Sequence, residues 1–180
     1  MAWLAQPTRS ADFVHSPPRT PFWIDDTGAK LFWLWHPDPE RVNTMRGNEI
    51  TPDIEQFLAK QPNLILATLR RNAGPQLSPV WYVWRDGAFF ISTVTSTAKW
   101  LNLLRDPRCS GIVDSPEGQY VYVSGVAELD DGDVYATTQQ IVRRYKSEEE
   151  FGPYMQSIYR EGHRGIIRLA PERVVTREFM

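Results

Sequence analysis

The amino-acid sequence predicts a mainly β protein in which about six antiparallel strands, with helices inserted between them, close into a small barrel. From residue 63 onward, short runs rich in apolar and β-branched residues are separated by turn-forming residues, which is typical of strands. Helical periodicity is confined to the stretches between those runs. This arrangement favours a closed barrel over a two-sheet sandwich.

The first part of the barrel is predicted to hold one helix and three strands. Thr51-Pro52-Asp53 supplies an N-cap hydroxyl, a proline at the first helical position and an acid in the first turn, which predicts a helix to about Lys60. Asp86-Gly87 is a two-residue hairpin signal, and a Gly-Pro break precedes it between two other runs. We expect an antiparallel meander of strands at 63–69, 76–84 and 88–94.

The remaining elements alternate between helices and strands. A helix over 98–105 is capped by Ser96 or Thr97 and ends before Asp106-Pro107. Beyond it, alternation and helical spacing predict strands at 109–113 and 119–129, helices at 133–145 and 148–159, and closing strands at 165–169 and 173–179.

Composition excludes several classes of protein. The 180 residues carry 20 basic and 22 acidic side chains, for a net charge of −2, so we expect no nucleic-acid partner. No apolar run approaches the ~20 residues that span a bilayer, so we expect no membrane partner. One cysteine and three scattered histidines exclude a disulfide framework and a zinc scaffold, and we expect no metal. The N-terminus lacks the pattern of a secretory signal, so we expect a cytoplasmic protein.

Residues 1–44 differ in composition from the rest of the chain. They hold four of the seven tryptophans and six of the fourteen prolines, without sustained periodicity of either kind. We expect a poorly ordered extension ahead of a barrel domain at 45–180. Two alternatives stay open: the segment packs its aromatic rings onto a partner or over a pocket, or Met45 is the natural start of the protein.

Motifs of self-contained catalysis are absent from the sequence. It has no G-x-S-x-G elbow, no His-Glu-x-x-His, no phosphate-binding G-x-x-x-x-G-K and no G-x-G-x-x-G after a strand. Cys109 lies in a predicted strand, where a buried and inert thiol is expected. We therefore name no catalytic residue, and if the protein is an enzyme its reactive group comes from a bound cofactor.

The start of the helix over 98–105 has the features of an anion site. The hydroxyls of Thr95, Ser96 and Thr97 lie beside the free backbone N–H groups of a helix N-terminus. Lys99 stands in the first turn, where its charge opposes the helix dipole unless an anion is bound. Asn102 follows on the same face and can donate as well. The alternative is an ordinary solvated first turn.

The strand at 76–84 offers a second candidate surface. Alternation places Gln76, Ser78, Val80 and Tyr82 on one face, with Leu77, Pro79, Trp81 and Val83 on the other. The first face mixes small, polar and aromatic groups, which suits a planar ring lying against a strand. The alternative is ordinary cross-strand packing, with the proline marking an edge position or a bulge.

Five stretches of the chain have a specific order and spacing: Leu66-Ala67-Thr68-Leu69, Gly74-Pro75-Gln76-Leu77-Ser78-Pro79-Val80-Trp81-Tyr82, Asp86-Gly87, Lys99-x-x-Asn102-Leu103-x-Arg105-Asp106-Pro107-Arg108, and Gly125-Val-Ala127-Glu128. Together they resemble the pyridoxamine-phosphate-oxidase-like split-barrel flavoproteins over about residues 50–180. The resemblance implies a six-stranded antiparallel split β-barrel of the FMN-binding type. It also implies a homodimer with two cofactor sites at its interface, holding FMN or the deazaflavin coenzyme F-420.

The same resemblance implies roles for individual residues. Carried over by position, the cofactor phosphate would be held by Ser96, Thr97, Ala98, Lys99 and Asn102. The ring of the cofactor would be lined by Gln76, Ser78, Pro79 and Val80. A further residue, Tyr120 of the partner subunit, would close the site.

Within that family the chain is more similar to the deazaflavin-dependent branch than to a true pyridoxamine phosphate oxidase. Its last strand is not followed by the Arg/His segment that grips pyridoxal phosphate, and Arg177-Glu178 stands where many relatives have a Trp-Asp pair. This implies an oxidoreductase that transfers hydride to a small unsaturated substrate. Two alternatives stay open: an FMN-dependent enzyme similar to pyridoxamine phosphate oxidase, and a non-catalytic barrel that binds a flavin or a haem-type ligand.

Overall fold

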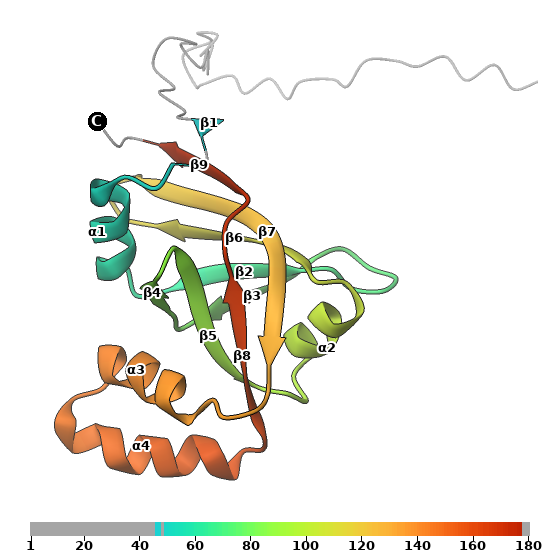
Figure 1. Cartoon of the computed structure of the whole chain (residues 1–180), viewed down its shortest axis with the longest axis vertical. Helices are drawn as coiled ribbons and strands as arrows, with labels where there is room; N and C mark the ends of the chain where they lie inside the picture. The colour runs from blue at the N-terminus through green and yellow to red at the C-terminus, as the bar shows by residue number, and fades with distance from the viewer. Residues whose placement is uncertain (1–45, 48, 178–180) are drawn as a thin grey trace, which may run out of the picture. The chain divides into compact units, whose positions relative to one another are not determined.

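The computed structural model describes residues 46–47 and 49–177, so the prediction for residues 1–44 lies outside the described part of the chain. The strands are β1 (Arg46–Gly47), β2 (Leu64–Thr68), β3 (Gln76–Val80), β4 (Val83–Arg85), β5 (Ala88–Val94), β6 (Arg108–Asp114), β7 (Tyr120–Asp130), β8 (Arg164–Leu169) and β9 (Arg173–Arg177). The helices are α1 (Pro52–Lys60), α2 (Ala98–Arg105), α3 (Tyr135–Tyr145) and α4 (Glu148–Arg160) (Figure 1). None of these four helices is both long and apolar enough to cross a membrane.

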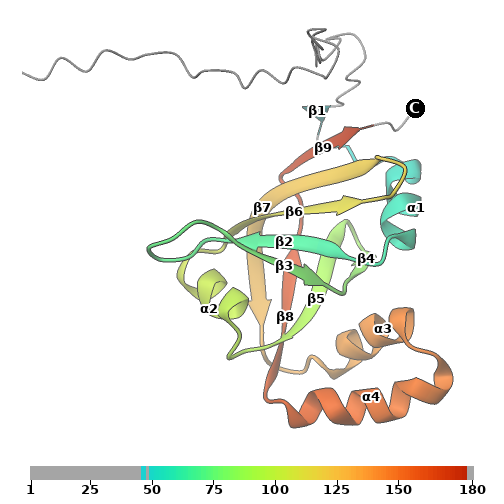
Figure 2. The same ribbon diagram turned by 180° about the vertical axis from the view of Figure 1, so that it is seen from behind.

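The strands form one curled antiparallel sheet. Its order is β3-β2-β6-β7-β8-β5-β4, with β9 paired to β7. The two end strands, β3 and β4, are consecutive in the chain and are separated only by Trp81 and Tyr82, which we name the corner. The sheet therefore curls until its two ends meet at the corner (Figures 1 and 2). The predicted fold class, a split β-barrel with inserted helices, is confirmed.

The strand count and the strand pairings refine the expected barrel. The described residues contain nine strands instead of six, in part because β1 pairs with β9 and because the strand expected at 76–84 breaks into β3 and β4. The expected meander is present, since β2 pairs with β3 and β4 pairs with β5. Two pairings that were not predicted complete the order: β2 also lies beside β6, and β5 lies beside β8. The break explains this order, because at the corner the chain leaves one half of the sheet and enters the other.

Elements that were predicted from local signals are confirmed. All four expected helices are present, with ends within two residues of the prediction. At the start of α1, the hydroxyl of Thr51 accepts a hydrogen bond of 3.4 Å from the Ile54 amide. Between β4 and β5, Asp86 and Gly87 have φ angles of 51° and 69°, as a tight hairpin turn requires.

The hydrophobic core fills the inside of the curled sheet. Strands of both halves supply it with fully buried side chains, including Leu66, Phe89, Ile91, Val121, Val123 and Ile167. α1 closes one side with Ile54, Phe57 and Leu58. The long strand β7 joins the halves, because its first part pairs with β6 and β9 and its last part pairs with β8.

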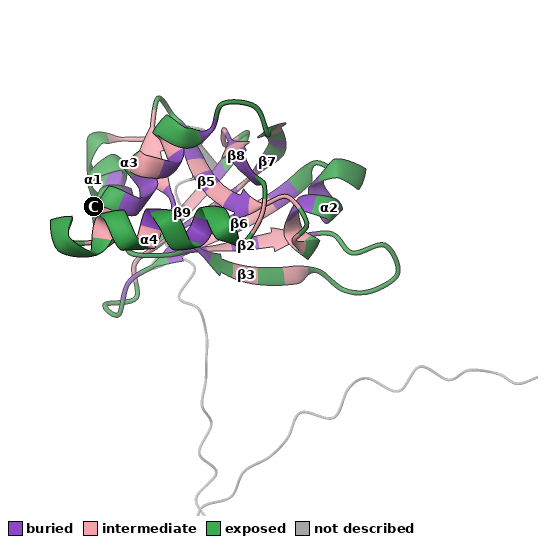
Figure 3. Ribbon diagram, turned by 90° about the horizontal axis from the view of Figure 1, so that it is seen from below, coloured by how far each residue is buried: buried purple, intermediate pink, exposed green. Residues whose placement is uncertain are grey.

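α3 and α4 form a helical layer outside the barrel. α3 packs against β4 and β5, and α4 packs against α3 (Figure 1). Each helix has a buried stripe and an exposed face, which is visible along α4 in Figure 3. The buried stripes are held by Ile141, Val142, Met155 and Ile158. This layer provides one wall of the candidate site.

Candidate functional site

α2 is fixed to the sheet by a close approach between Trp100 and Gly165. Trp100 is buried, and a Cβ atom at Gly165 of β8 would lie 2.3 Å from its ring, well inside the 3.0 Å that real Cβ contacts respect. Only glycine allows an indole ring to rest on the strand in this way. The N-cap residue Thr97 makes no side-chain cap bond, and its hydroxyl lies 3.2 Å from that of Thr93. The first turn of α2, with Lys99, is thereby held beside β5 and β8.

A cavity of about 210 Å³, which we name the inner cavity, lies between the end of β3, β5, α2, α3, α4 and the start of β8. Its charged groups are Lys99 and Arg164. Its hydroxyl groups belong to Ser92, Thr93 and Thr138. The rest of the lining is apolar or aromatic and consists of Pro79, Val80, Trp81, Ile141, Val142, Tyr154 and Ile158.

The two cations of the inner cavity are poorly compensated. Lys99 is half-buried and forms no hydrogen bond or ion pair with any described residue. Burial lowers its pKa below the ordinary value of 10.5, and the positive charge of Arg164 lowers it further. Two like charges therefore face one cavity, and this arrangement favours the entry of an anion.

Arg164 is only 9% exposed, which is rare for a charged side chain. Its Nε donates to the hydroxyl of Ser92 at 3.0 Å, and its Nη1 donates to the carbonyl of Ile158 at 3.3 Å. The ion pair with Glu161 is long, at 4.0 Å, and that carboxylate is mostly exposed. Burial lowers the pKa of the guanidinium. Several of its five N–H groups have no partner in the part of the chain that the structure describes.

Aromatic side chains form a further part of the lining, which we name the aromatic wall. The ring of Trp81 stacks on Tyr145 of α3, with centroids 4.4 Å apart and planes 2° from parallel. Tyr154 of α4 extends the wall, with its centroid 5.3 Å from that of Trp81. The corner positions this indole, because the Tyr82 amide donates to the Tyr145 hydroxyl at 3.0 Å. A planar ligand can lie against such a wall.

Three of the residues expected to bind the cofactor line the inner cavity, namely Pro79, Val80 and Lys99. The other residues expected at the phosphate, Ser96, Thr97 and Ala98, lie directly before Lys99 but do not line the cavity. Ser78 lies on β3, half-buried. Tyr120 lies at the start of β7, paired with β9 and outside this cavity.

Asn102 and Gln76 hydrogen-bond to each other and do not line the inner cavity. The buried amide of Asn102 donates to the Gln76 side-chain oxygen at 3.0 Å and to the Thr68 hydroxyl at 3.1 Å. Its own oxygen accepts a bond of 3.3 Å from Arg105. Both amide hydrogens are therefore used, and in this structure Asn102 ties α2 to β2 and β3.

The sequence analysis missed Arg164, Trp81 and Tyr154. The sequence contains one signal for Arg164. It is a charged residue at the first position of β8, directly before an apolar run, where burial of the strand can bury the charge with it. Trp81 was assigned to the opposite face from Val80, and this assignment failed because the strand breaks there. No local signal indicates that α4 brings Tyr154 to the cavity.

The chemistry available in the inner cavity is binding and orientation. No carboxylate, imidazole or thiol lines it. Cys109 is buried elsewhere in β6, and burial raises the pKa of its thiol to about 11, which suits the inert role expected for it. Among the described residues no group of three histidine, cysteine or acidic side chains could hold a metal ion. The site can hold an anion at one end and a planar ring against its aromatic wall.

The fold defines a split-barrel protein, and its inner cavity combines two cations with an aromatic wall. A family model described as pyridoxamine 5'-phosphate oxidase matches residues 50–178. The chain belongs to that family.

Solved structures share this fold at low sequence identity. A conserved hypothetical protein from Mycobacterium tuberculosis is 23% identical, with 72% of this chain and 85% of that chain covered and a TM-score of 0.62. An F420 reductase is 21% identical, with 69% and 98% covered and a TM-score of 0.58. The haem storage protein HutZ from Vibrio cholerae is 19% identical, with 73% and 96% covered and a TM-score of 0.57. At such identities the likeness shows the common fold.

Proposed function

We propose that this protein is an oxidoreductase that binds a deazaflavin or flavin cofactor, coenzyme F-420 or FMN, and transfers hydride to a small unsaturated substrate. The observation that carries the proposal is the half-buried, unpaired Lys99 beside the buried Arg164, in a cavity that the aromatic wall also lines. Both cofactors join an anionic phosphate tail to a planar ring. The family match and the likeness to an F420 reductase support this choice of ligand.

The residues present fit a phosphate-bearing ligand. Lys99 would neutralise the phosphate, and the free backbone N–H groups in the first turn of α2, which begins at Ala98, would donate to it. The positive charge of Arg164 adds to the attraction. The ring would lie against Trp81 and the segment of β3 that ends at Val80.

We also propose that the functional form is a homodimer. The inner cavity of one chain, at about 210 Å³, is smaller than the about 300 to 1,000 Å³ of common ligand sites. A second copy would enlarge and close it, with Tyr120 of the partner subunit as one contributor. An apolar sheet face is available for pairing, since Ile65, Ile112 and Tyr122 lie side by side in register and half-exposed, and Leu77 nearby is 63% exposed.

The bound cofactor supplies the hydride chemistry, and the residues of this chain supply binding and orientation. Lys99 holds the phosphate tail, which fixes the position of the ring. Trp81 and Tyr154 cover one side of the inner cavity and exclude water from it. None of the described residues that line the inner cavity carries a carboxylate or an imidazole, and the proposal requires no proton transfer by a side chain there.

Titration of the purified protein with FMN and with F-420 tests the proposal. Lys99→Ala should raise the Kd by about 10- to 100-fold, since a charge-assisted contact is lost. Lys60→Ala, which removes an exposed lysine from α1, is the matched control and should leave the Kd unchanged. The thermal midpoint of the cofactor-free Lys99→Ala protein should be nearly that of the wild type. An unaltered Kd in Lys99→Ala would remove the anion site.

The identity of the cofactor follows from a second measurement. Protein purified yellow from a host that lacks the deazaflavin indicates FMN. Colourless protein that quenches the fluorescence of added F-420 indicates the deazaflavin. The likeness to a haem storage protein and the lack of an acid–base pair favour one alternative, a non-catalytic binding barrel. Tight cofactor binding without oxidation or reduction of any unsaturated test substrate would favour that alternative.

A further inference from the structure

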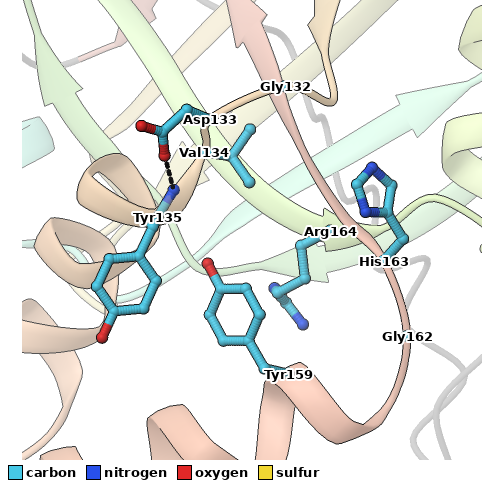
Figure 4. Close-up of a pocket in the computed structure, with 8 residues that line it drawn as sticks. All are labelled: Gly132, Asp133, Val134, Tyr135, Tyr159, Gly162, His163 and Arg164. Atoms are coloured by element: carbon cyan, nitrogen blue, oxygen red, sulfur yellow. Dashed lines mark hydrogen bonds between the residues drawn. The ribbon is translucent and has the colours of Figure 1, made fainter.

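A second hollow, of about 520 Å³, lies beside the inner cavity and is more than twice as large. It is bounded by residues 132–135, which connect β7 to α3, and by the end of α4 and the start of β8 (Figure 4). We name it the outer hollow. Among the described residues, Arg164 alone lines both this hollow and the inner cavity. The family resemblance assigns no residue of the outer hollow.

Two tyrosine rings form an exposed aromatic surface in the outer hollow. Tyr135 of α3 and Tyr159 of α4 have centroids 5.5 Å apart, with ring planes inclined by 45°. Their side chains are 50% and 37% exposed. Figure 4 shows the two rings side by side on one side of the hollow. Paired rings that leave part of their surface in water offer apolar area and hydroxyl groups to a planar ligand.

A positive group lies next to these rings. Figure 4 shows the guanidinium of Arg164 beside the ring of Tyr159. Its Nε donates to Ser92, and its Nη1 donates to Ile158 and lies 4.0 Å from the Glu161 carboxylate. Its Nη2 makes no hydrogen bond to a described residue and is available to a ligand. A planar guanidinium with free N–H groups matches a carboxylate, which can accept two parallel hydrogen bonds.

Two other ionisable side chains of the outer hollow, His163 and Asp133, each form a hydrogen bond with the backbone. His163 Nε2 lies 2.9 Å from the Asp131 carbonyl oxygen, so this nitrogen carries the hydrogen and donates it. The Asp133 carboxylate accepts from the Tyr135 amide at 3.4 Å and lies, in the view of Figure 4, on the far side of Val134 from Arg164. The groups of the outer hollow that remain to bind a ligand are the guanidinium of Arg164 and the exposed rings of Tyr135 and Tyr159.

We propose that the outer hollow binds a planar aromatic carboxylate, with its ring against Tyr135 and Tyr159 and its carboxylate on Arg164. The proposal stands on the hollow, the exposed ring pair and the free N–H groups of a buried arginine. It does not depend on a flavin in the inner cavity. Because Arg164 borders both spaces, a ligand in the outer hollow would also reduce the positive charge that the inner cavity presents to a phosphate.

Titration of the cofactor-free protein with 2-naphthoate tests this inference. We expect saturable binding, and we expect the neutral 2-naphthamide, which has the same ring, to bind about tenfold more weakly. Arg164→Gln should make the two probes bind alike. Since Arg164 is buried and that variant could fail to fold, the naphthoate-to-naphthamide ratio in the wild type is the primary readout. No binding of 2-naphthoate to the folded protein, or equal binding of both probes, overturns the proposal.

Two tyrosine variants locate the binding. Tyr135→Ala removes a ring that lines only the outer hollow, and it should weaken 2-naphthoate binding about tenfold. Tyr154→Ala removes a ring that lines the inner cavity and not the outer hollow, and it should leave 2-naphthoate binding unchanged. Circular dichroism checks that both variants are folded. The reverse pattern would place the probe in the inner cavity and contradict the assignment.

Discussion

Arg144 at the corner and Lys99 in the inner cavity both lie near aromatic rings, but only Arg144 has its hydrogen-bond donors satisfied by described residues of the protein. At the corner, Arg144 donates to the Tyr82 carbonyl at 2.8 Å and to the Leu58 and Ala59 carbonyls at 3.0 and 2.9 Å, and also to that of Gln61. In the inner cavity, Lys99 has no such partner among the described residues. The comparison separates a cation that builds the fold from one that is available to a ligand.

Tyr82 shows how completely the corner is satisfied. Its hydroxyl donates to the Leu58 carbonyl at 2.6 Å and its ring lies under the Arg144 guanidinium at 4.4 Å. Burial raises the pKa of this phenol to about 12, so it stays neutral at physiological pH. The orphan carbonyl groups at the end of α1 are thus taken up by one tyrosine and one arginine. The hydroxyl of Tyr82 and the guanidinium of Arg144 are therefore engaged by the protein itself.

The largest expected effect is on the corner. Arg144→Met removes hydrogen bonds to four carbonyl groups and should lower the free energy of unfolding by about 2 to 4 kcal/mol. Arg143→Met is the matched control, because the neighbouring Arg143 makes an exposed ion pair with Glu148 at 2.9 Å and should cost under about 1 kcal/mol. Urea unfolding measures both. Equal losses in the two variants would mean that Arg144 is not the structural cation we describe.

A smaller loss of stability is expected at Asn102, whose side chain is used by the protein, as that of Arg144 is, but makes fewer hydrogen bonds. Asn102→Ala breaks its bonds to Thr68 and Gln76 and should lower the free energy of unfolding by about 1 to 2 kcal/mol. Asn72→Ala, in the exposed β2–β3 loop, is the control and should have almost no effect. Cofactor titration sharpens the comparison: a large rise in Kd with unchanged stability would make Asn102 a ligand-binding residue instead of a tie.

The sequence was informative where the determining contacts are local. The cap at Thr51 and the turn at Asp86-Gly87 depend on neighbouring residues, and both were predicted correctly. The order of the strands was not, because the pairing of β2 with β6 and of β5 with β8 depends on where the corner bends the chain. That bend is stabilised by Arg144, which lies 62 residues from Tyr82, and such a contact leaves no periodic signal.

The same distinction applies to the candidate site. Lys99 was identified from its position in the first turn of a helix, and the structure places it in the inner cavity. Arg164 was missed, since its proximity to Lys99 arises only when β8 pairs with β5, so that Arg164 lies opposite Val94. Asn102 was placed on the right element, but its partners lie 26 and 34 residues away in the chain. The spacing of residues in the sequence could therefore identify the Asn102 amide as a hydrogen-bond donor, but it could not show that the amide donates to Thr68 and Gln76.

The smallest expected effect concerns Lys99 and pH. Because burial lowers its pKa in the folded protein, the unfolded chain binds more protons between the lowered value and 10.5. The stability of the cofactor-free protein should therefore gain a small increment as pH rises through that alkaline window, and Lys99→Met should remove this increment. Thermal midpoints of the two proteins from about pH 8 to about pH 10 measure the difference. An increment of the opposite sign would mean that the folded chain stabilises the ammonium, and Lys99 would then resemble Arg144 instead of contrasting with it.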